Sequence, residues 1–211
     1  IIERLQKGER VAMVTDAGTP AVSDPGARLV RAVMQAGFRV SPVPGASAVV
    51  AALSAAGLEP AGFHFVGFLP PQTKLRRRKV TGLVQQKESF VLYEAPHRVR
   101  DVFKDMGELL QPARRVVVAR EITKKFETFS AMTASELIAF ADEHEPRGEY
   151  VILIDEQPQD ESVSLSEKDS RWLRALAAQM PASKAAATAA KIVGLPRDTL
   201  YQWLLANKES A

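Results

Sequence analysis

The sequence contains no cysteine, only three histidines and no long apolar run, and each of these absences excludes a class of protein. Without cysteine the chain forms no disulfide and no thiolate metal site. His64, His97 and His144 do not lie at the spacing of metal ligands, so we expect no metal centre. No apolar run approaches membrane-spanning length, and no secretory signal is visible. The expectation that remains is a cytoplasmic enzyme or binding protein.

The residues that are present suffice for a folded core. The chain has 211 residues, 46% of them hydrophobic, which fits one large domain or two small ones. A net charge of +3 is compatible with binding nucleic acid but does not establish it. The charge is unevenly spread, because residues 74–79 (KLRRRK) hold five cations while residues 155–161 hold four acids and no base.

The first 57 residues alternate between predicted strands and helices, and these units indicate a mostly parallel α/β sheet. The predicted strands cover residues 10–14, 38–43, 62–68, 89–93, 115–119, 127–131 and 150–154. The predicted helices cover residues 1–7, 27–36, 48–57, 72–86, 99–110 and 134–142.

The loop of residues 15–26, TDAGTPAVSDPG, is the most informative stretch. Ligands bind to open α/β sheets where strands end in such loops, and this one is about twice the usual length. Its glycines allow backbone to approach a ligand closely. Asp16 and Asp24 suit a ligand with ribose hydroxyls, or a cation, better than phosphates. The alternative is an ordinary connection in which Asp16 caps a turn.

A helical region is predicted after an acidic, apolar-poor linker. Its last two helices, residues 183–193 and 196–206, are separated by Gly194 and fit a helix-turn-helix outline. Such an outline serves RNA contact, packing or dimerisation equally well. The candidate RNA contacts there are Lys184, Lys191, Arg197, Tyr201 and Lys208.

We therefore expect four parts along the chain. They are the remainder of an N-terminal α/β lobe (residues 1–60), a second α/β lobe (61–155), a linker (156–166) and a helical domain (167–211). Residues 1–5 look like the middle of an amphipathic helix, so we expect an upstream segment and an incomplete first lobe.

Six motifs, in order, resemble the tetrapyrrole methylase superfamily. The resemblance is closest to its small-subunit ribosomal RNA methyltransferase I branch, the bacterial 2′-O-ribose methyltransferases. The motifs cover residues 14–26, 43–58, 65–70, 93–98, 119–128 and 147–155, and the tail at 182–205 is also similar. The chain departs from the branch at Ala46, often proline there, and lacks the family's TPIGN-like and EDTR-like motifs.

The resemblance implies a homodimeric enzyme that binds S-adenosylmethionine (SAM) in a cleft between two α/β lobes. SAM binds folded up in this family, so the lack of a GxGxxG motif is expected. The implied substrate is a cytidine ribose in the decoding region of 16S rRNA, in the small ribosomal subunit. The implied cofactor-binding residues are Asp16, Ala17, Gly18, Thr19, Pro20, Asp24, Gly45, Ser47, Tyr93, Glu94, Gly148 and Glu149.

Several of these residues have a plainer interpretation. Asp24 equally well faces the transfer site or holds its own loop. Ser47 also fits a helix N-cap, a role compatible with holding a carboxylate at the helix start. Tyr93 is equally consistent with core packing, and Gly148 with a plain turn.

Ribose methylation requires alignment of the 2′ oxygen and removal of its proton. The candidate bases are Glu121 and Glu94, each at the end of a predicted strand. Arg120 is a further catalytic candidate, because a cation lowers the pKa of an attacking hydroxyl or clamps a phosphate. His97 is a secondary candidate. A surface salt bridge between Glu121 and Lys124 is the competing interpretation.

A cluster of cations is the candidate RNA-binding surface, because such clusters contact phosphates. Its members are Lys74, Arg76, Arg77, Arg78 and Lys79, with Arg98 and Lys124 from later loops. The alternative is a solvated helix face. Two other functions compete: a corrin-precursor or diphthine-type methyltransferase, which needs no basic run, and a non-catalytic RNA-binding fragment, which needs no SAM loop.

Overall fold

The computed structural model describes residues 1–58, 62–86, 88–157 and 165–207. It divides into two compact units, Ile1–Pro158 and Gln159–Ala211. The predicted linker, residues 156–166, lies largely outside the described ranges. The boundary that we expect near residue 60 stays a prediction.

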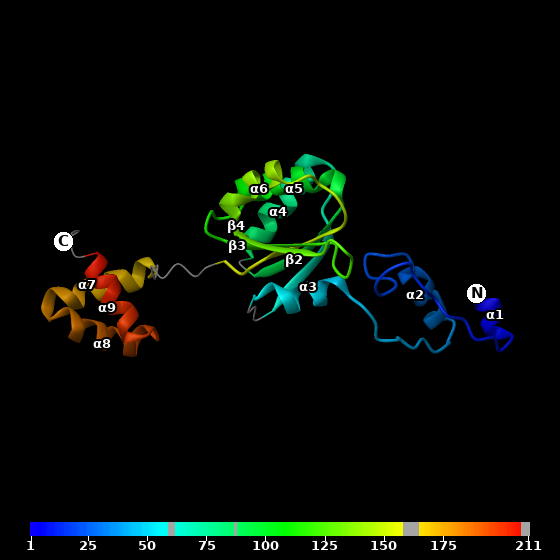
Figure 1. Cartoon of the computed structure of the whole chain (residues 1–211). Helices are drawn as coiled ribbons and strands as arrows, with labels where there is room; N and C mark the ends of the chain where they lie inside the picture. Colours follow the sequence, from blue (N-terminus) through cyan, green and yellow to red (C-terminus); the bar gives the residue numbers. More distant parts are fainter. Residues whose placement is uncertain (59–61, 87, 158–164, 208–211) are drawn as a thin grey trace. The chain divides into compact units, whose positions relative to one another are not determined.

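A five-stranded sheet in the order β1-β2-β5-β3-β4 forms the centre of the first unit (Figure 1). β1 pairs with β2 in parallel, whereas β2–β5, β5–β3 and β3–β4 are antiparallel. The strands are β1 (Phe63–Phe68), β2 (Ser89–Glu94), β3 (Arg115–Arg120), β4 (Thr128–Thr133) and β5 (Tyr150–Ile154).

The prediction of a mostly parallel sheet is therefore wrong. β3 and β4 are joined by residues 121–127 alone, which is too short for a parallel crossover and forces an antiparallel pair. β5 then inserts between β2 and β3, antiparallel to both. Alternation of strands and helices in the sequence did not reveal this insertion.

The strands expected at residues 10–14 and 38–43 are also not formed. Within the described ranges neither segment pairs with another strand. Val14 and Val43, which end the two segments, are each 85% exposed. A strand is stabilised by hydrogen bonds to a neighbour and by burial of its apolar face, and both are missing here.

Helices cover both faces of the sheet. α4 (Thr73–Gln85), α5 (Pro96–Leu109) and α6 (Leu137–Glu143) lie on one face, and α3 (Ala48–Ala56) lies on the other (Figure 1). Val116 and Val118 of β3 pack into the first core, while Val117 and Ala119 pack under α3. The inner strands β2, β3 and β5 therefore alternate between two buried layers, as expected for a sheet covered on both sides. Among its described residues this unit also contains α1 (Ile2–Gln6), α2 (Ala27–Gln35) and the short 3-10 helix η1 (Ala134–Glu136).

The direction of α3 is fixed at its carboxyl end by Arg115, the first residue of β3. The Arg115 guanidinium donates hydrogen bonds to the carbonyl oxygens of Ala56 and Gly57, at 3.2 and 2.5 Å. The last turn of α3 thus lies at the beginning of β3. Because α3 crosses the sheet from there, its first turn lies toward the edge at which β3 ends.

The second unit is a three-helix domain with its own core. α7 (Glu167–Gln179), α8 (Ala182–Val193) and α9 (Arg197–Ala206) bury Leu173, Leu200 and Leu204 against the alanines of α8. Gly194 ends α8 with a φ of 71°, a conformation that favours glycine. The predicted helical segments are confirmed, while Lys208 lies outside the described residues.

Candidate active site

One edge of the sheet collects the ends of three strands. Phe68 at the end of β1 is in register with Tyr93, and Glu94 at the end of β2 is in register with Tyr150. Tyr150 in turn faces Arg120, the last residue of β3. We call this the carboxyl edge of the sheet. It is the edge at which ligands bind to open α/β sheets.

The predicted cofactor loop, residues 15–26, lies against this edge. The Thr19 hydroxyl donates a hydrogen bond to the Ala46 carbonyl oxygen at 2.9 Å, just before α3. At Gly67 of β1, a Cβ atom would lie 3.2 Å from the Ser23 hydroxyl, a tight contact that shows how closely the loop approaches β1. Gly67 also has a φ of 72° at a register shift between β1 and β2.

Tyr93 connects the edge to the first turn of α3. Its ring packs edge-on against Phe65 and Phe68, with ring centroids 4.9 and 5.8 Å away. Burial raises the pKa of the Tyr93 hydroxyl, and the backbone N–H of Val49 in α3 partly opposes that shift. The core-packing interpretation of Tyr93 is therefore observed, and its place beside α3 also makes it a wall of the candidate site.

The donors and acceptors around this edge suit a ligand with a carboxylate and ribose hydroxyls. Asp16 is exposed and has no hydrogen bond or ion pair within the described part of the chain. Ser47 occupies the N-cap position of α3, but its side chain makes no capping hydrogen bond. The first N–H groups of α3 that no carbonyl accepts can therefore hold a carboxylate. The residues present fit the cofactor implied by the sequence resemblance.

Asp24 holds its own loop. Its carboxylate accepts a short hydrogen bond from the Thr15 hydroxyl, across the base of the loop. Of the two roles left open for Asp24, the structure favours the one within the loop.

Glu121 lies directly after β3, and its carboxylate already accepts two hydrogen bonds within the fold. Its Oε1 atom accepts hydrogen bonds from the Lys124 ammonium and the Glu149 backbone N–H, both at 2.9 Å. The Lys124 contact and then the Glu149 amide lower the pKa of the Glu121 carboxyl. Gly148 has a φ of 76°, and a Cβ atom there would lie 2.4 Å from the Glu121 carboxylate. Gly148 is therefore more than a plain turn, because any side chain would displace Glu121.

The salt-bridge interpretation of Glu121 is thus observed in the structure. Lys124 is shared between Glu121 and the Glu149 carboxylate, 3.0 Å away, so its ammonium is already paired within the fold, and its contact with RNA stays a prediction. The Arg120 guanidinium donates to the Arg147 carbonyl oxygen at 2.7 Å. A carboxylate with a lowered pKa is a weaker proton acceptor, so this geometry disfavours Glu121 as the base.

Glu94 is the second candidate base, and it is buried, with only 2% of its surface exposed. Its Oε1 atom accepts a hydrogen bond from the Ala95 N–H at 2.9 Å and lies 3.3 Å from the Arg98 Nε atom. Its Oε2 atom is buried and has no hydrogen-bond partner among the described residues. Burial raises the pKa of the Glu94 carboxyl, an effect that the Ala95 amide and Arg98 only partly offset.

Arg98 fixes the chain between β1 and α4. Its Nη2 atom donates to the carbonyl oxygens of Leu69, at 2.6 Å, and Pro70, at 3.4 Å. These contacts hold Arg98 inside the unit, so the expectation that it binds RNA phosphate is corrected. His97, the secondary base candidate, is exposed in the first turn of α5.

The basic run at residues 74–79 divides between the core and the surface. Arg76 is only 4% exposed, and its Nε atom bonds the buried Asp105 carboxylate at 2.6 Å. Arg77 bonds Asp105 and Glu108 at 2.8 and 2.7 Å. The expectation that Arg76 contacts RNA is therefore corrected, because this side chain turns inward and is neutralised there.

The outward cations of this run lie along one face of α4. Lys74, Arg78 and Lys79 are exposed, and none has an ion pair within the described part of the chain. Arg78 and Lys79 line an open hollow of about 440 Å³ together with Leu75 and Pro70. Cations around an apolar floor suit an RNA strand better than a uniformly charged face does.

Two positions that matter for the site, Gly67 and Asp105, were not predicted from the sequence. Gly67 was assigned simply to a strand, although a glycine inside a strand pattern signals a bulge or a close approach. Asp105 was not identified as the partner of the basic run, because its contact with Arg76 spans 29 residues. Among the described residues, no group of three or more histidines and carboxylates is placed to hold a metal ion. No helix in those ranges is long and apolar enough to cross a membrane.

Comparison with known families gives two matches along the chain. Residues 1–138 match the family described as Tetrapyrrole (Corrin/Porphyrin) Methylases. Residues 163–208 match the RsmI C-terminal HTH domain. The chain is thus a SAM-dependent methyltransferase of the tetrapyrrole methylase class, with a helical C-terminal domain, as the sequence predicted.

Individual relatives show which family of the tetrapyrrole methylase class the chain belongs to. The protein named Ribosomal RNA small subunit methyltransferase I from Neisseria meningitidis serogroup B is 45% identical over 210 residues, which are 99% of this chain and 72% of that protein. Its namesake from Pseudomonas aeruginosa is 43% identical, over 97% of this chain and 73% of that protein. The chain belongs to the ribosomal RNA small subunit methyltransferase I family, and this recognition is confirmed.

Solved structures show the same fold at low sequence identity. The cobalt precorrin-4 methyltransferase CbiF matches with a TM-score of 0.57 and 22% identity, over 73% of this chain and 67% of that one. The methyltransferase CobJ matches with a TM-score of 0.56 and 21% identity, over 74% and 68%. These likenesses support the fold and carry no information about substrate.

Proposed function

We propose that the protein transfers the methyl group of SAM to the 2′-hydroxyl of a cytidine ribose in the decoding region of 16S rRNA. The observation that carries this proposal is the carboxyl edge of the sheet. There the loop of residues 15–26, the start of α3 and the candidate base Glu94 come together. An outward basic face on α4 belongs to the same unit.

We further propose which residues hold the cofactor. The first turn of α3, reached through Gly45 and Ser47, takes the carboxylate, because its N–H groups carry a partial positive charge. Asp16 accepts hydrogen bonds from the ribose hydroxyls or the ammonium group. Gly18 leaves the loop backbone open to the ligand.

Asp16→Ala is expected to weaken SAM binding about 10- to 150-fold, since a hydrogen bond to a charged acceptor contributes about 1.5–3 kcal/mol. Its exposed side chain packs against nothing that folding requires, so unfolding should be unchanged. Titration calorimetry measures the affinity. Asp142→Ala, at an exposed carboxylate of α6, is the matched control. Equal affinities for the two variants would exclude Asp16 from the cofactor site.

The proposed reaction needs alignment and one proton acceptor. The cofactor supplies an electrophilic methyl carbon with a good leaving group. The chain holds the ribose so that the 2′ oxygen faces that carbon in line, and Glu94 accepts the 2′ proton. The raised pKa of Glu94 supports this assignment, because a base works best when its pKa lies near the operating pH.

The RNA backbone is proposed to follow the outer face of α4. Lys74, Arg78 and Lys79 supply phosphate contacts, and Leu75 with exposed Phe68 of β1 offers apolar surface for a base. Neutralising phosphates releases counterions, so binding through this face must weaken as salt rises.

Lys79→Glu is expected to weaken RNA binding and to reduce the slope of log affinity against log salt by about 1. SAM affinity should stay the same. The measurement is a filter-binding titration over a range of salt concentrations. Lys104→Glu makes the same charge change at an exposed lysine of α5 that does not line the hollow beside Arg78 and Lys79. Should both variants give the same salt slope, α4 is only a solvated face.

The decisive test of the proposed function is transfer of labelled methyl groups from SAM to unmethylated small ribosomal subunits. Mass spectrometry of the digested RNA then identifies the product. A 2′-O-methylcytidine in the decoding region supports the proposal. SAM binding without label in RNA favours a small-molecule or protein methyltransferase instead. We also propose a cytoplasmic homodimer, for which sedimentation equilibrium is the test.

A further inference from the structure

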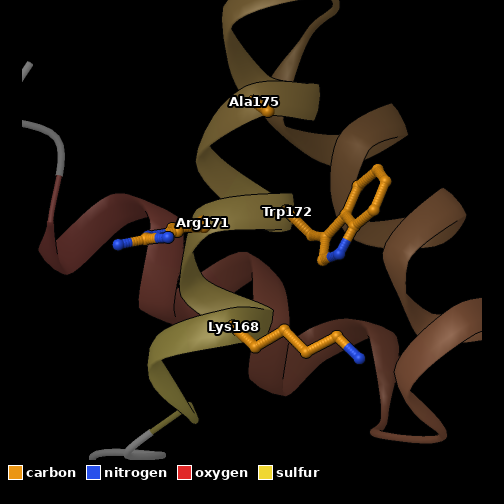
Figure 2. Close-up of a pocket in the computed structure, with 4 residues that line it drawn as sticks. All are labelled: Lys168, Arg171, Trp172 and Ala175. Atoms are coloured by element: carbon orange, nitrogen blue, oxygen red, sulfur yellow. The ribbon is translucent and has the colours of Figure 1, made fainter.

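A stripe of four residues on α7 stands apart from the core of the second unit. Lys168, Arg171, Trp172 and Ala175 recur at three- and four-residue spacing, so they share one face of the helix. They line an open hollow of about 580 Å³. Figure 2 shows Lys168 and Trp172 extending to one side of α7 and Arg171 to the other, with Ala175 one turn further along.

The stripe faces away from the helix packing. Leu173 lies in the core, and Leu176 and Ala177 pack against it from the same side of α7. Trp172 leaves 54% of its surface exposed, although an indole buries more favourably than most side chains. Nothing in the packing of the three helices requires a tryptophan at this position.

The other tryptophan of the chain is placed differently. Trp203 of α9 is partly buried against the core, and the Arg174 guanidinium lies 5.3 Å from its ring centroid. Trp203 thus has a structural partner, whereas Trp172 lines the open hollow with Lys168 on the same side of α7 (Figure 2). An open aromatic ring beside cations is the arrangement that stacks a nucleobase and contacts its phosphates.

Asp169, an acid of the same helix, is held at the start of α7, where Ser166 and Asp169 exchange hydrogen bonds at 2.6 and 3.1 Å. The stripe places the cation Lys168 beside an apolar centre formed by Trp172 and Ala175. This chemistry fits a polyanion that carries flat rings, and it disfavours an apolar protein surface.

We propose that this α7 stripe binds single-stranded RNA, with a base stacked on Trp172 and a phosphate held by Lys168. The proposal rests on the proposed function, since it gives the second unit a role in holding the same RNA substrate. It places that contact on α7, outside the α8–turn–α9 pair from which the sequence suggested Lys184, Lys191 and Arg197.

The test uses the full chain and a short oligouridine as probe. Trp172→Ala is expected to weaken binding about 5- to 100-fold, the range observed when one base–aromatic stack is removed. Trp172→Phe should keep most of the affinity. RNA should quench the tryptophan fluorescence of the wild type but not of Trp172→Phe, in which only Trp203 remains. Because Trp172 is exposed, neither substitution should unfold the domain.

The matched charge pair is Lys168→Glu against Lys104→Glu, an exposed lysine of α5 in the first unit. Lys168→Glu should lower the salt slope by about 0.7, the value per phosphate contact on a single strand. Lys104→Glu should leave it unchanged. If the Trp172 and Lys168 variants keep the wild-type affinity for oligouridine and the wild-type quenching of tryptophan fluorescence, the proposal is wrong. The stripe would then be tested for binding to a protein partner. Methyl transfer to ribosomal subunits, measured in parallel, reports on the proposed function whatever the stripe does.

Discussion

Glu94→Gln is expected to lower the turnover number for methyl transfer by about 10²- to 10⁴-fold, the usual contribution of a general base. Glutamine keeps the shape of the side chain and its acceptor for the Ala95 N–H. It cannot accept the 2′ proton. RNA affinity should not change, because the cations of α4 are untouched. The measurement is a single-turnover assay at saturating SAM, which separates the chemical step from binding.

The same variant has a pH signature that distinguishes catalysis from folding. Burial raises the pKa of Glu94, so the folded chain binds this proton more tightly than the unfolded chain does. The stability that this group contributes is therefore present below the ordinary glutamate pKa and is lost as the pH rises through the folded value. Glu94→Gln should remove that decline. A variant that is at least as well folded at neutral pH and still inactive has lost chemistry and not structure.

The Glu121→Gln variant tests the assignment of Glu94, and not Glu121, as the general base. The Glu121 carboxylate is neutralised by Lys124 and the Glu149 amide, and its pKa is lowered. We expect a smaller loss of activity, through displacement of the turn at Gly148. If Glu121→Gln abolishes transfer while Glu94→Gln retains it within a few-fold, Glu121 is the base.

The sequence was sufficient to place the elements of the central sheet, because each has a strong local signal. Residues 115–120 form a strand with buried valines on each face of the sheet, and α5 and α6 carry apolar residues at helical spacing. Strand pairing depends on contacts that are distant in the sequence, and its prediction failed at two places. β3 and β4 form an antiparallel pair, and β5 inserts between β2 and β3, antiparallel to both. The length of the 121–127 connection did contain the information needed to predict the antiparallel pair.

In the candidate site, too, local features could be predicted from the sequence, whereas contacts between distant residues could not. That Glu94 ends one strand and Glu121 directly follows another was readable from the sequence, and Glu94 of β2 and Arg120 of β3 are both in register with Tyr150. Which of the two is neutralised was not readable, because the Glu121 partners lie near the turn at Gly148, 28 residues away for the Glu149 amide. A pattern of charges shows which ions are close in the sequence, whereas the pKa of a carboxyl depends on burial and on partners brought by the fold.

Arg76→Ala is expected to destabilise the first unit by about 3–5 kcal/mol, because it leaves the buried Asp105 carboxylate without its main partner. Arg77 also bonds Asp105, at 2.8 Å, so we expect the lower part of that range. Both tryptophans lie in the second unit, so fluorescence would not detect this change. Urea unfolding followed by circular dichroism is the suitable measurement.

Two controls separate this structural role from RNA binding. Arg78→Ala, at an exposed neighbour on α4, should leave stability unchanged within about 0.5 kcal/mol, as surface substitutions usually do. Replacing Arg76 and Asp105 together by leucine should recover much of the lost stability, because an apolar pair needs no desolvation of charge. If Arg76→Ala instead folds as stably as the wild type and binds RNA less tightly, the side chain faces the nucleic acid. The division of the basic run between core and surface would then be wrong.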